Sequence, residues 1–458
     1  MRIQLSEHFT YKKLLLFALP TIATMLFSMI YAIVDGLFAS NFVGKSAFTA
    51  INLIVPFISI LGAIGFMFGA GGSALVAKAI GEGEREKANH IFSLLVCVIV
   101  SSGILCTVIG EIFLPQIAVL LGANEETYEY CMLYGRIVLG SLTFFMLQNI
   151  FQGFFVVAEK AKLGLIITVC SGLTNIILDA LFVLAFKWGI VGTAVATSAS
   201  QMVGSVIPII YFLSKNNSLL RFAKPVWNIK ALIRTCTNGS SEFLTTISSS
   251  VVTLLYNFQL LKLAGNDGVA AFGVITYIAT IFMYIFSGYA VGCSPIISYH
   301  FGAKNELEVK NVLRKSLVII FISGIIMTGL SEALAYPLTK IFVSSDEGLC
   351  NMTVNGLRIY VVCFLICGVN IFASAFFTAL NNGFASFAIS FIRTVIFQIS
   401  AIMVLPIFFY LNGVWCAILV SESLAIIISI AFLVGYRKKY NYSIFKTNRS
   451  NNARTKNG

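Results

Sequence analysis

The sequence predicts an all-α polytopic membrane protein with twelve transmembrane helices in two parallel six-helix repeats. Of its 458 residues, 58% are hydrophobic and only 11% are charged, less than half the roughly 25% of charged residues found in soluble domains. Twelve apolar stretches are each long enough, at about 20 residues, to cross a bilayer as a helix. Landmark residues in the first half also recur in the second half at one constant separation. We call this separation the repeat offset; it is the distance along the chain from Gly71 to Gly292. This regularity indicates an internal duplication.

The apolar stretches are too long for the alternating ten-residue segments of a transmembrane β-barrel. The first stretch is also too long for the apolar part of a signal peptide and contains Asp35, so we expect a retained helix. The expected spans are 14–38, 47–70, 91–114, 131–157, 163–186, 190–213, 243–264, 269–297, 316–336, 354–380, 384–410 and 414–436.

The repeat divides the chain into an N-lobe (1–213), a cytoplasmic linker (214–235) and a C-lobe (236–436). A disordered polar cytoplasmic tail (437–458) follows. Gly81 is matched by Gly302 and Phe151 by Phe372 at the repeat offset. Because each half holds an even number of spans, both halves enter the membrane from the same side. We therefore expect a pseudo-twofold axis along the membrane normal, an arrangement typical of transporters that alternate access by rocking one lobe against the other.

The net charge of +12 is explained by topology. The loops on one side of the expected spans, together with both termini, hold 24 of the 31 basic residues. The positive-inside rule then places both termini in the cytoplasm of a multi-pass cell-membrane protein. Contact with membrane lipids is expected, and a nucleic-acid partner is not. The ten cysteines lie almost wholly within spans and form no CxxC pattern, so neither a disulfide framework nor a metal site is indicated.

No nucleotide site is expected. The segment Gly44-Lys45-Ser46 ends like a phosphate-binding loop, but the required first glycine is replaced by Ala39. The spans also leave no room for a soluble ATP-binding domain. A secondary transporter without a cofactor is therefore predicted, with an ion gradient as its energy source.

Ionisable residues within the spans are candidates for ion coupling, because a charge at the bilayer centre costs about 2.5–3.5 kcal/mol on insertion scales. The three arginines within spans could pair with some of the acids. The candidates are Asp35, Asp179, Glu242, Glu332 and Glu422, with Glu111 near a span end and the arginines Arg136, Arg358 and Arg393.

Asp35 and Asp179 are the strongest candidates. Asn175 lies one helical turn before Asp179, Tyr31 lies one turn before Asp35, and Thr197 is in the next span. Carboxylate, amide and hydroxyl oxygens suit a small hard cation such as sodium, and a buried aspartate can instead carry a proton. A purely structural hydrogen-bond cluster between helices remains the alternative.

These residues together resemble the multidrug and toxic compound extrusion (MATE) family over about residues 10–436. The first-span aspartate and the Asn-x-x-x-Asp of the fifth span resemble its DinF-like branch. The resemblance rests on the two six-span repeats and on Pro20, Tyr31, Asp35, Asn175, Asp179 and Thr197.

The resemblance implies a transporter that exports organic cations and other amphipathic toxic compounds in exchange for protons or sodium ions. It implies an ion site at Asp35, Asn175, Asp179 and Thr197, with substrate bound in the cleft between the lobes. Pro20 matches the proline about which the first helix bends when Asp35 is protonated. From the residues alone, a simple packing kink at Pro20 is the alternative.

The C-lobe departs from the NorM-like branch of the same family. The expected spans 269–297 and 354–380 contain no Asp or Glu, so we expect no ion site there. Glu242 is a candidate gate or helix cap, and His300 is a candidate gate or a structural histidine. Aromatic faces would suit flat cationic substrates. Most aromatic residues must nevertheless face lipid or core, and the candidate cleft residues are Phe144, Phe151, Phe154 and Phe155.

Three functions are compatible with these features. The first is an antiporter for cationic or amphipathic small molecules, working as a monomer. The second is a flippase for lipid-linked sugars or cell-wall precursors with the same two-lobe fold, which would favour more basic residues in the cleft. The third is a membrane-embedded enzyme, which would want clustered histidines and acids. His8, His90 and His300 are far apart in the sequence, so the enzyme is disfavoured.

Overall fold

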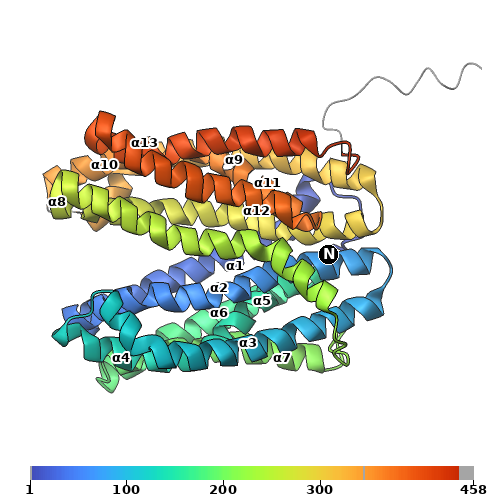
Figure 1. Ribbon diagram of the computed structural model, residues 1–458, viewed down its shortest axis with the longest axis horizontal. Helices are drawn as coiled ribbons and strands as arrows, with labels where there is room; N and C mark the ends of the chain where they lie inside the picture. Colours follow the sequence, from blue (N-terminus) through green and yellow to red (C-terminus); the bar gives the residue numbers. More distant parts are fainter. Residues whose placement is uncertain (1–2, 344–345, 443–458) are drawn as a thin grey trace, which may run out of the picture.

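The computed structural model describes residues 3–343 and 346–442, which form helices joined by short connections and contain no strand (Figure 1). The first half comprises α1 (Tyr11–Phe38), the π-helical segment η1 (Ala39–Val43), α2 (Lys45–Gly81), α3 (Arg85–Leu120), α4 (Glu125–Gly140), α5 (Leu142–Val157), α6 (Ala161–Asp179), η2 (Ala180–Ala185) and α7 (Ile190–Leu213). The second half comprises α8 (Ile229–Gly302), α9 (Glu306–Phe342), α10 (Glu347–Val361), α11 (Phe364–Ala379), α12 (Gly383–Phe391), η3 (Ile392–Phe397) and α13 (Gln398–Gly435). The expected all-α class is confirmed.

Two of these helices contain the end of one span and the start of the next. The chain turns sharply within α8 at Gly265 (φ 64°, ψ −150°) and within α13 at Tyr410 (φ 51°, ψ −132°). The Gly265 turn separates the expected seventh and eighth spans, and the Tyr410 turn separates the last two. With these turns counted, the described helices account for the twelve expected spans.

Two spans that we expected to be continuous, 131–157 and 354–380, are broken helices. α4 and α5 meet at 51°, and α10 and α11 meet at 50°. At the first break the Ser141 hydroxyl donates to the Val138 carbonyl oxygen (2.9 Å) and to Gln201 Oε1 (2.7 Å). The second break lies at Val362, the counterpart of Ser141 at the repeat offset. Neither break contains proline, so the hydrophobic pattern alone did not reveal it.

The described tail and linker add two details to the expected organisation. Residues 214–228 contain no helix, and α8 begins at Ile229, so the last seven residues of the expected linker are helical. Of the expected disordered tail, residues 443–458 lie outside the described part of the chain.

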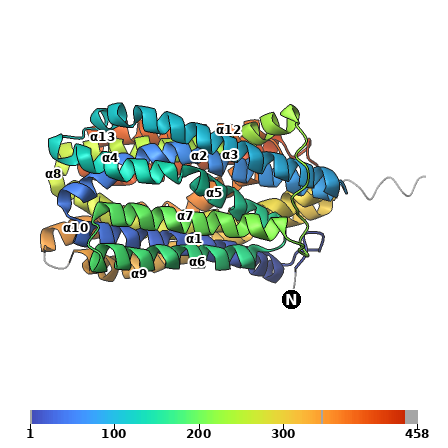
Figure 2. The same cartoon turned by 90° about the horizontal axis from the view of Figure 1, so that it is seen from below.

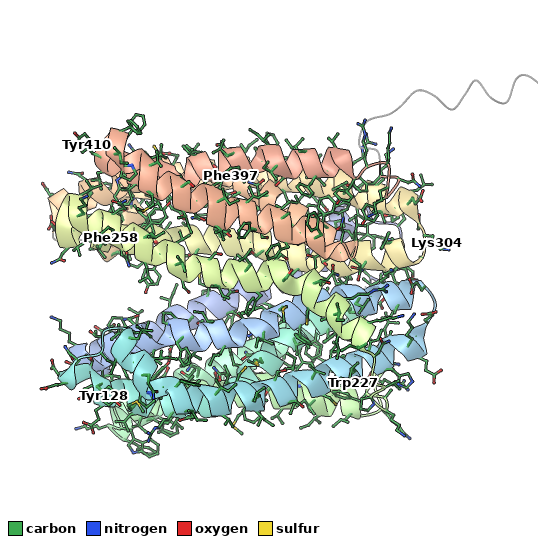
Figure 3. The ribbon with its side chains drawn as sticks, in the orientation of Figure 1. Tyr128, Trp227, Phe258, Lys304, Phe397 and Tyr410 are labelled. Atoms are coloured by element: carbon green, nitrogen blue, oxygen red, sulfur yellow. The ribbon has the colours of Figure 1, made fainter. Side chains whose placement is uncertain are left out.

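The ribbons of the two lobes converge at one end of the molecule and diverge toward the other (Figures 1 and 3). Lys304 and Trp227 mark the first end, which we call the closed end. Tyr128, Phe258 and Tyr410 mark the opposite end, which we call the splayed end. Within the N-lobe, α6 and α7 run side by side along the outer face (Figure 2).

The lobes meet at the closed end through glycines packed directly on backbone. A Cβ atom added at Gly81 would lie 2.0 Å from the Tyr299 carbonyl oxygen, and one at Gly302 would lie 2.1 Å from the Lys78 carbonyl oxygen. The repeat offset takes Gly81 to Gly302 and Lys78 to Tyr299, so the pseudo-twofold relates the two contacts. Similarly close contacts between the lobes are made by Gly71, Gly239, Gly288 and Gly292.

A segment before α1, residues 3–10, bridges the two lobes at the closed end. The Leu5 backbone N–H donates to Glu159 Oε1 of the N-lobe (2.8 Å). The Phe9 backbone N–H donates to Glu308 Oε1 of α9 (2.8 Å), and Lys315 Nζ donates to the Phe9 carbonyl oxygen (2.7 Å). The Leu5 and Phe9 side chains are fully buried. This segment therefore connects the lobes by hydrogen bonds as well as by apolar packing.

The outer surface of the bundle is apolar, as membrane helices require. Leu120, Ile341 and Ile407 are 84%, 75% and 70% exposed, and many other large aliphatic side chains point outward along the helices (Figure 3). A soluble protein rarely exposes apolar residues so extensively. Eight helical segments in the described part of the chain are long and apolar enough to cross a bilayer. Two more qualify if α4 with α5, and α10 with α11, each count as one bent span.

Candidate functional site

Asp35 and Asp179 both lie where an α-helix widens into a π-helical segment. Asp35 is in the last turn of α1, just before η1, and Asp179 is the last residue of α6, directly before η2. The two π-helical segments contact each other, and α1 packs against α6. Single turns of π-helix occur frequently at functional sites. Local helix geometry therefore brings the two acids together in the half of the N-lobe nearer the splayed end.

The four residues expected at the ion site form one cluster. The Asp35 carboxyl group lies beside the side chains of Asp179, Asn175 and Thr197. Asn175 Nδ2 donates to Asp35 Oδ1 at 3.4 Å. Asp179 and Asn175 are 0% and 1% exposed, so the cluster is buried inside the lobe.

The cluster contains more oxygen acceptors than the described protein atoms satisfy. Both carboxylate oxygens of Asp179, Asn175 Oδ1 and Thr197 Oγ1 are buried and have no hydrogen-bond partner among the described residues. An unsatisfied buried polar atom costs about 1–3 kcal/mol, and a charged one costs more. A bound cation, or protons on the carboxylates, would satisfy these oxygens. The donor set therefore fits a sodium ion or a proton.

A cavity of about 240 Å³ opens beside the cluster. Its polar lining includes five residues that the sequence pattern did not indicate: Ser59, Tyr134, Gln148, Ser200 and Gln201. Gln201 lies one helical turn after Thr197 on α7, and this spacing is the signal that could have identified it. The lining residues are Tyr31, Ala32, Asp35, Val55, Ile58, Ser59, Tyr134, Val138, Phe145, Gln148, Asn175, Thr197, Ser200 and Gln201.

Tyr31 is held in this cavity by α6. A Cβ atom added at Gly172 would lie 2.9 Å from Tyr31 Cδ1 and 2.7 Å from Phe27 Cε1, so the two aromatic rings pack directly on the α6 backbone. Pro20 lies further toward the closed end, and α1 continues through it as one helix. Thr24 Oγ1 donates to the Pro20 carbonyl oxygen at 2.8 Å. Tyr31 therefore belongs to the cluster's surroundings, and Pro20 lies outside them.

The two candidate gate residues lie apart from the acid cluster. Glu242 is on α8, one turn beyond Gly239, whose close contact with Met67 joins the lobes. His300 is 2% exposed at the closed end, and its ring makes an edge contact with Phe9 at a centroid distance of 6.4 Å. The histidine is therefore enclosed beneath the bridging segment 3–10.

Three of the four aromatic residues expected in a cleft are buried in this structure, and their contact with substrate stays a prediction. Phe151, Phe154 and Phe155 are at most 2% exposed and pack with Phe92 and Phe212 in the core of the N-lobe. Apolar packing on several sides explains their position, because hydropathy does not distinguish a core face from a cleft face. Phe144 is partly exposed.

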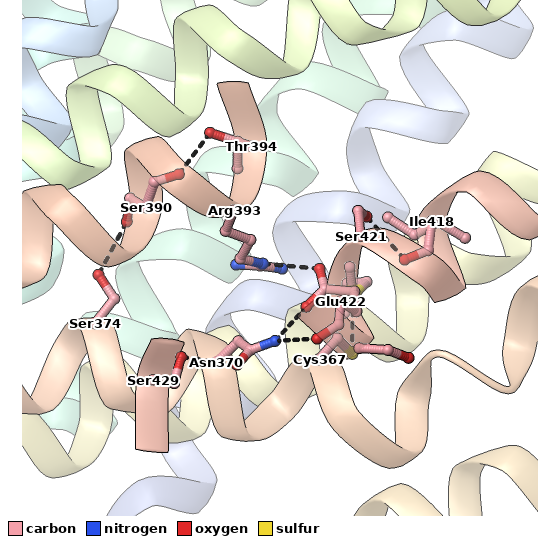
Figure 4. A network of polar contacts seen from close by, with 12 residues as sticks. Cys367, Asn370, Ser374, Ser390, Arg393, Thr394, Ile418, Ser421, Glu422 and Ser429 are labelled. Atoms are coloured by element: carbon pink, nitrogen blue, oxygen red, sulfur yellow. Dashed lines mark hydrogen bonds and ion pairs between the residues drawn. The ribbon is translucent and has the colours of Figure 1, made fainter. Parts of the chain in front are cut away.

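The C-lobe contains a buried polar network that differs from the N-lobe cluster (Figure 4). Arg393 Nε lies 2.7 Å from Glu422 Oε1, and Asn370 Nδ2 donates to Glu422 Oε2 at 2.7 Å. Ser429 Oγ donates to Asn370 Oδ1 at 2.8 Å. Glu422 is 1% exposed. Both carboxylate oxygens are thus satisfied by protein donors.

The other two arginines within the spans are also paired with glutamates. Arg136 lies 4.0 Å from Glu111 and Arg358 lies 3.6 Å from Glu332, in both cases measured from Nε to a carboxylate oxygen. Glu332 is the counterpart of Glu111 at the repeat offset, whereas the position that corresponds to Arg136 is Leu357 and the arginine is the next residue. The expectation that the arginines would pair with acids in the spans is confirmed for all three.

The fold is that of a membrane transporter built from two repeats. The MatE family model matches residues 20–181 and again residues 243–404. The two matches cover one lobe each and together more than half of the chain, and they show that the chain belongs to the MatE family, as the residues of the acid cluster indicated.

Among curated proteins, the chain is similar to proteins named "Multidrug export protein MepA". It is 25% identical to that of Staphylococcus saprophyticus, over 88% of each chain. It is 26% identical to that of Staphylococcus haemolyticus, over 94% of this chain and 95% of the relative.

Solved structures show the same fold. A MATE protein solved in complex with MaL6 has a TM-score of 0.91 at 20% identity and matches 95% of this chain and 98% of its own. The outward-facing conformation of a multidrug resistance MATE transporter of the MOP superfamily has a TM-score of 0.90, with the same identity and coverage.

Proposed function

We propose that this protein is a secondary active antiporter that exports cationic or amphipathic small molecules in exchange for protons or sodium ions. The observation that carries the proposal is the acid cluster, where Asp35 and Asp179 lie together among buried oxygens without protein partners. The family and the multidrug-export relatives support export of drug-like substrates. The family and the relatives are both consistent with a transporter rather than an enzyme.

The cluster supplies a physical basis for coupling. Two carboxyl groups side by side in a membrane-buried site repel each other when both are charged. A cation or a proton removes this repulsion, so the occupied and empty states of the cluster favour different packings of α1 against α6. Asp35 lines the cavity whereas Asp179 is sealed, so an entering ion meets Asp35 first.

We further propose that the closed end faces the cytoplasm. The basic loops, the linker 214–228 and the described parts of both termini lie at this end, in agreement with the positive-inside rule. In this orientation the splayed lobes open outward, and rocking of the N-lobe against the C-lobe would open the opposite side.

A flippase for lipid-linked sugars is not favoured. Such a substrate carries phosphate groups and would require unpaired basic side chains inside the bundle. Arg393 is paired with Glu422, and Arg136 and Arg358 are 64% and 57% exposed, so neither lies inside the bundle.

The proposal is tested with purified protein in proteoliposomes, by following efflux of an ethidium-type dye under a proton gradient and then under a sodium gradient. We expect one gradient to drive efflux, and Asp35→Asn and Asp179→Asn to abolish the driven component. Glu111→Gln is the matched control, because it neutralises an acid in a membrane helix outside the cluster. Undiminished driven efflux in both aspartate variants would refute the mechanism.

A further inference from the structure

The two lobes carry their buried carboxylates at different positions of the repeat. Glu422 corresponds to Gln201 of the N-lobe, and Asn370 corresponds to Asn149, at the repeat offset. In the other direction, Asp179 corresponds to Ser400. Each lobe therefore carries its buried acid at a position where the other lobe is neutral.

The position of Arg393 shows how the C-lobe accommodates a large cationic side chain. Its N-lobe counterpart is Gly172, where a Cβ atom would already lie 2.7 Å from Phe27. The C-lobe counterpart of Phe27 is Ser248, which is small and buried. The aromatic ring of the N-lobe position is thus replaced by a small serine in the C-lobe, and the Arg393 side chain is 12% exposed and directed to Glu422.

The Glu422 network is complete without any external ion. One carboxylate oxygen bonds to the Arg393 guanidinium and the other to the Asn370 amide, whose own oxygen accepts from Ser429. A guanidinium keeps its proton in proteins, so its charge does not exchange with the solution. The N-lobe cluster differs because Asp179 has no cationic side chain as partner and its oxygens are unsatisfied among the described residues.

We propose that Arg393 is a resident counter-cation for Glu422. It fills in the C-lobe the place that an exchangeable cation takes in the N-lobe, and so confines ion exchange to the cluster of Asp35 and Asp179. This inference rests on the proposed antiport function. It adds a specific claim, that the Glu422 pocket is a cation site permanently occupied by the protein's own side chain.

The inference is tested by emptying the pocket and refilling it. Arg393→Gly installs the residue of the matched N-lobe position and leaves Glu422 without its cation. We expect the thermal unfolding midpoint of the purified variant to fall, and to rise again with millimolar guanidinium chloride, far below denaturing concentrations, because ligand binding to the folded state stabilises it. Choline chloride at equal ionic strength is the salt control.

The double variant Arg393→Gly, Glu422→Gln lacks the carboxylate and should show no guanidinium-dependent rise. An equal response of the single and double variants would overturn the proposal. If Arg393→Gly does not fold, Arg393→Met with Glu422→Gln replaces the pair by neutral groups of similar size. This variant should retain gradient-driven efflux with the ion dependence of the unaltered protein, and a changed ion dependence would equally overturn the inference.

The outcome is distinguishable from failure of the antiport function itself. If Asp35→Asn and Asp179→Asn leave driven efflux intact, the proposed function fails whatever the guanidinium experiment shows. If those variants abolish efflux and guanidinium does not stabilise Arg393→Gly beyond the double variant, only the role of Arg393 fails.

Discussion

The N-lobe cluster and the C-lobe network are products of one duplicated bundle. The carboxylate oxygens of Asp179 in the first lack hydrogen-bond partners among the described residues, whereas those of Glu422 in the second have them. In the N-lobe, Asp179 is fully buried with both carboxylate oxygens unsatisfied by the described protein. In the C-lobe, Glu422 is equally buried but bonds to Arg393 and Asn370. Burial of an acid is therefore not sufficient to identify an ion site. The unsatisfied oxygens distinguish the two regions.

The difference also has an energetic meaning. A buried ion pair contributes little net stability, but removing one partner is costly because the other is left uncompensated. An incomplete acid cluster is costly by itself until an ion or a proton occupies it. Mutations in the C-lobe network should therefore mainly lower the free energy of unfolding, and mutations in the N-lobe cluster should mainly impair ion-driven transport.

The largest effect is expected at Asp179 compared with its C-lobe counterpart Ser400. Asp179→Asn removes a charged ligand worth about 3 kcal/mol, which corresponds to a roughly 100-fold loss of ion affinity. Ser400→Asn should leave efflux unchanged, since this exposed residue belongs to no acid cluster. Ion-driven efflux and ion binding to the purified variants measure both effects. Equal losses in the two variants would mean that the lobes share the ion chemistry.

The next effect concerns the stability of the C-lobe. Glu422→Gln leaves the Arg393 guanidinium buried without its carboxylate, and we expect a destabilisation of about 3–5 kcal/mol. Combining it with Arg393→Met should recover most of the loss. Thermal unfolding of the purified variants is the measurement. If Glu422→Gln alone is as stable as the unaltered protein, Arg393 does not depend on the Glu422 carboxylate as the distances indicate.

A smaller effect is expected at Gly172, where the two lobes differ in side-chain volume. Gly172→Ala places a methyl group against Phe27 and Tyr31, an overpacking that costs about 1–3 kcal/mol. Displacement of Tyr31 should also shift the ion concentration that gives half-maximal efflux. The control is Gly329→Ala on α9, where a Cβ atom would meet nothing within 4 Å. Identical behaviour of the two alanine variants would contradict the packing argument.

The smallest effect is expected from Ser429→Ala. The change removes one hydrogen bond to Asn370 Oδ1 and should destabilise the protein by about 1 kcal/mol. Ion dependence of efflux should remain as it was, because the Glu422 carboxylate keeps both of its donors. A shift in ion dependence here would bring the C-lobe network into the transport cycle.

Much of the architecture could be predicted from the sequence because membrane spans are long, apolar and repeated. Asp35, Asn175 and Asp179 were identifiable because acids are rare inside spans, and a spacing of four residues places Asn175 and Asp179 on one helix face. The break at Ser141 was not identifiable, because it contains no proline and the contact of Ser141 with Gln201 joins two helices that come together only on folding.

The pairing of Arg393 with Glu422 shows the same limit within the site. The two residues lie on different helices, and three arginines and several acids offered many combinations. Only tertiary packing selects one. Phe151 and Phe154 illustrate the converse case, since an aromatic residue in a span looks the same in sequence whether it faces core, cleft or lipid. Their burial beside Phe92 follows from the way α3, α5 and α7 pack together.

The paired glycine contacts at the closed end have a consequence for how easily the lobes can part. Gly81 and Gly302 each rest on a carbonyl oxygen of the opposite lobe, but that oxygen belongs to a helix in which backbone groups already bond to one another. Parting these two glycine contacts therefore leaves no backbone donor or acceptor unpaired, whereas the bridging segment 3–10 at the same end adds hydrogen bonds between the lobes. The contact consists of close van der Waals packing, and because the repeat supplies it twice about one axis, the two halves can release together.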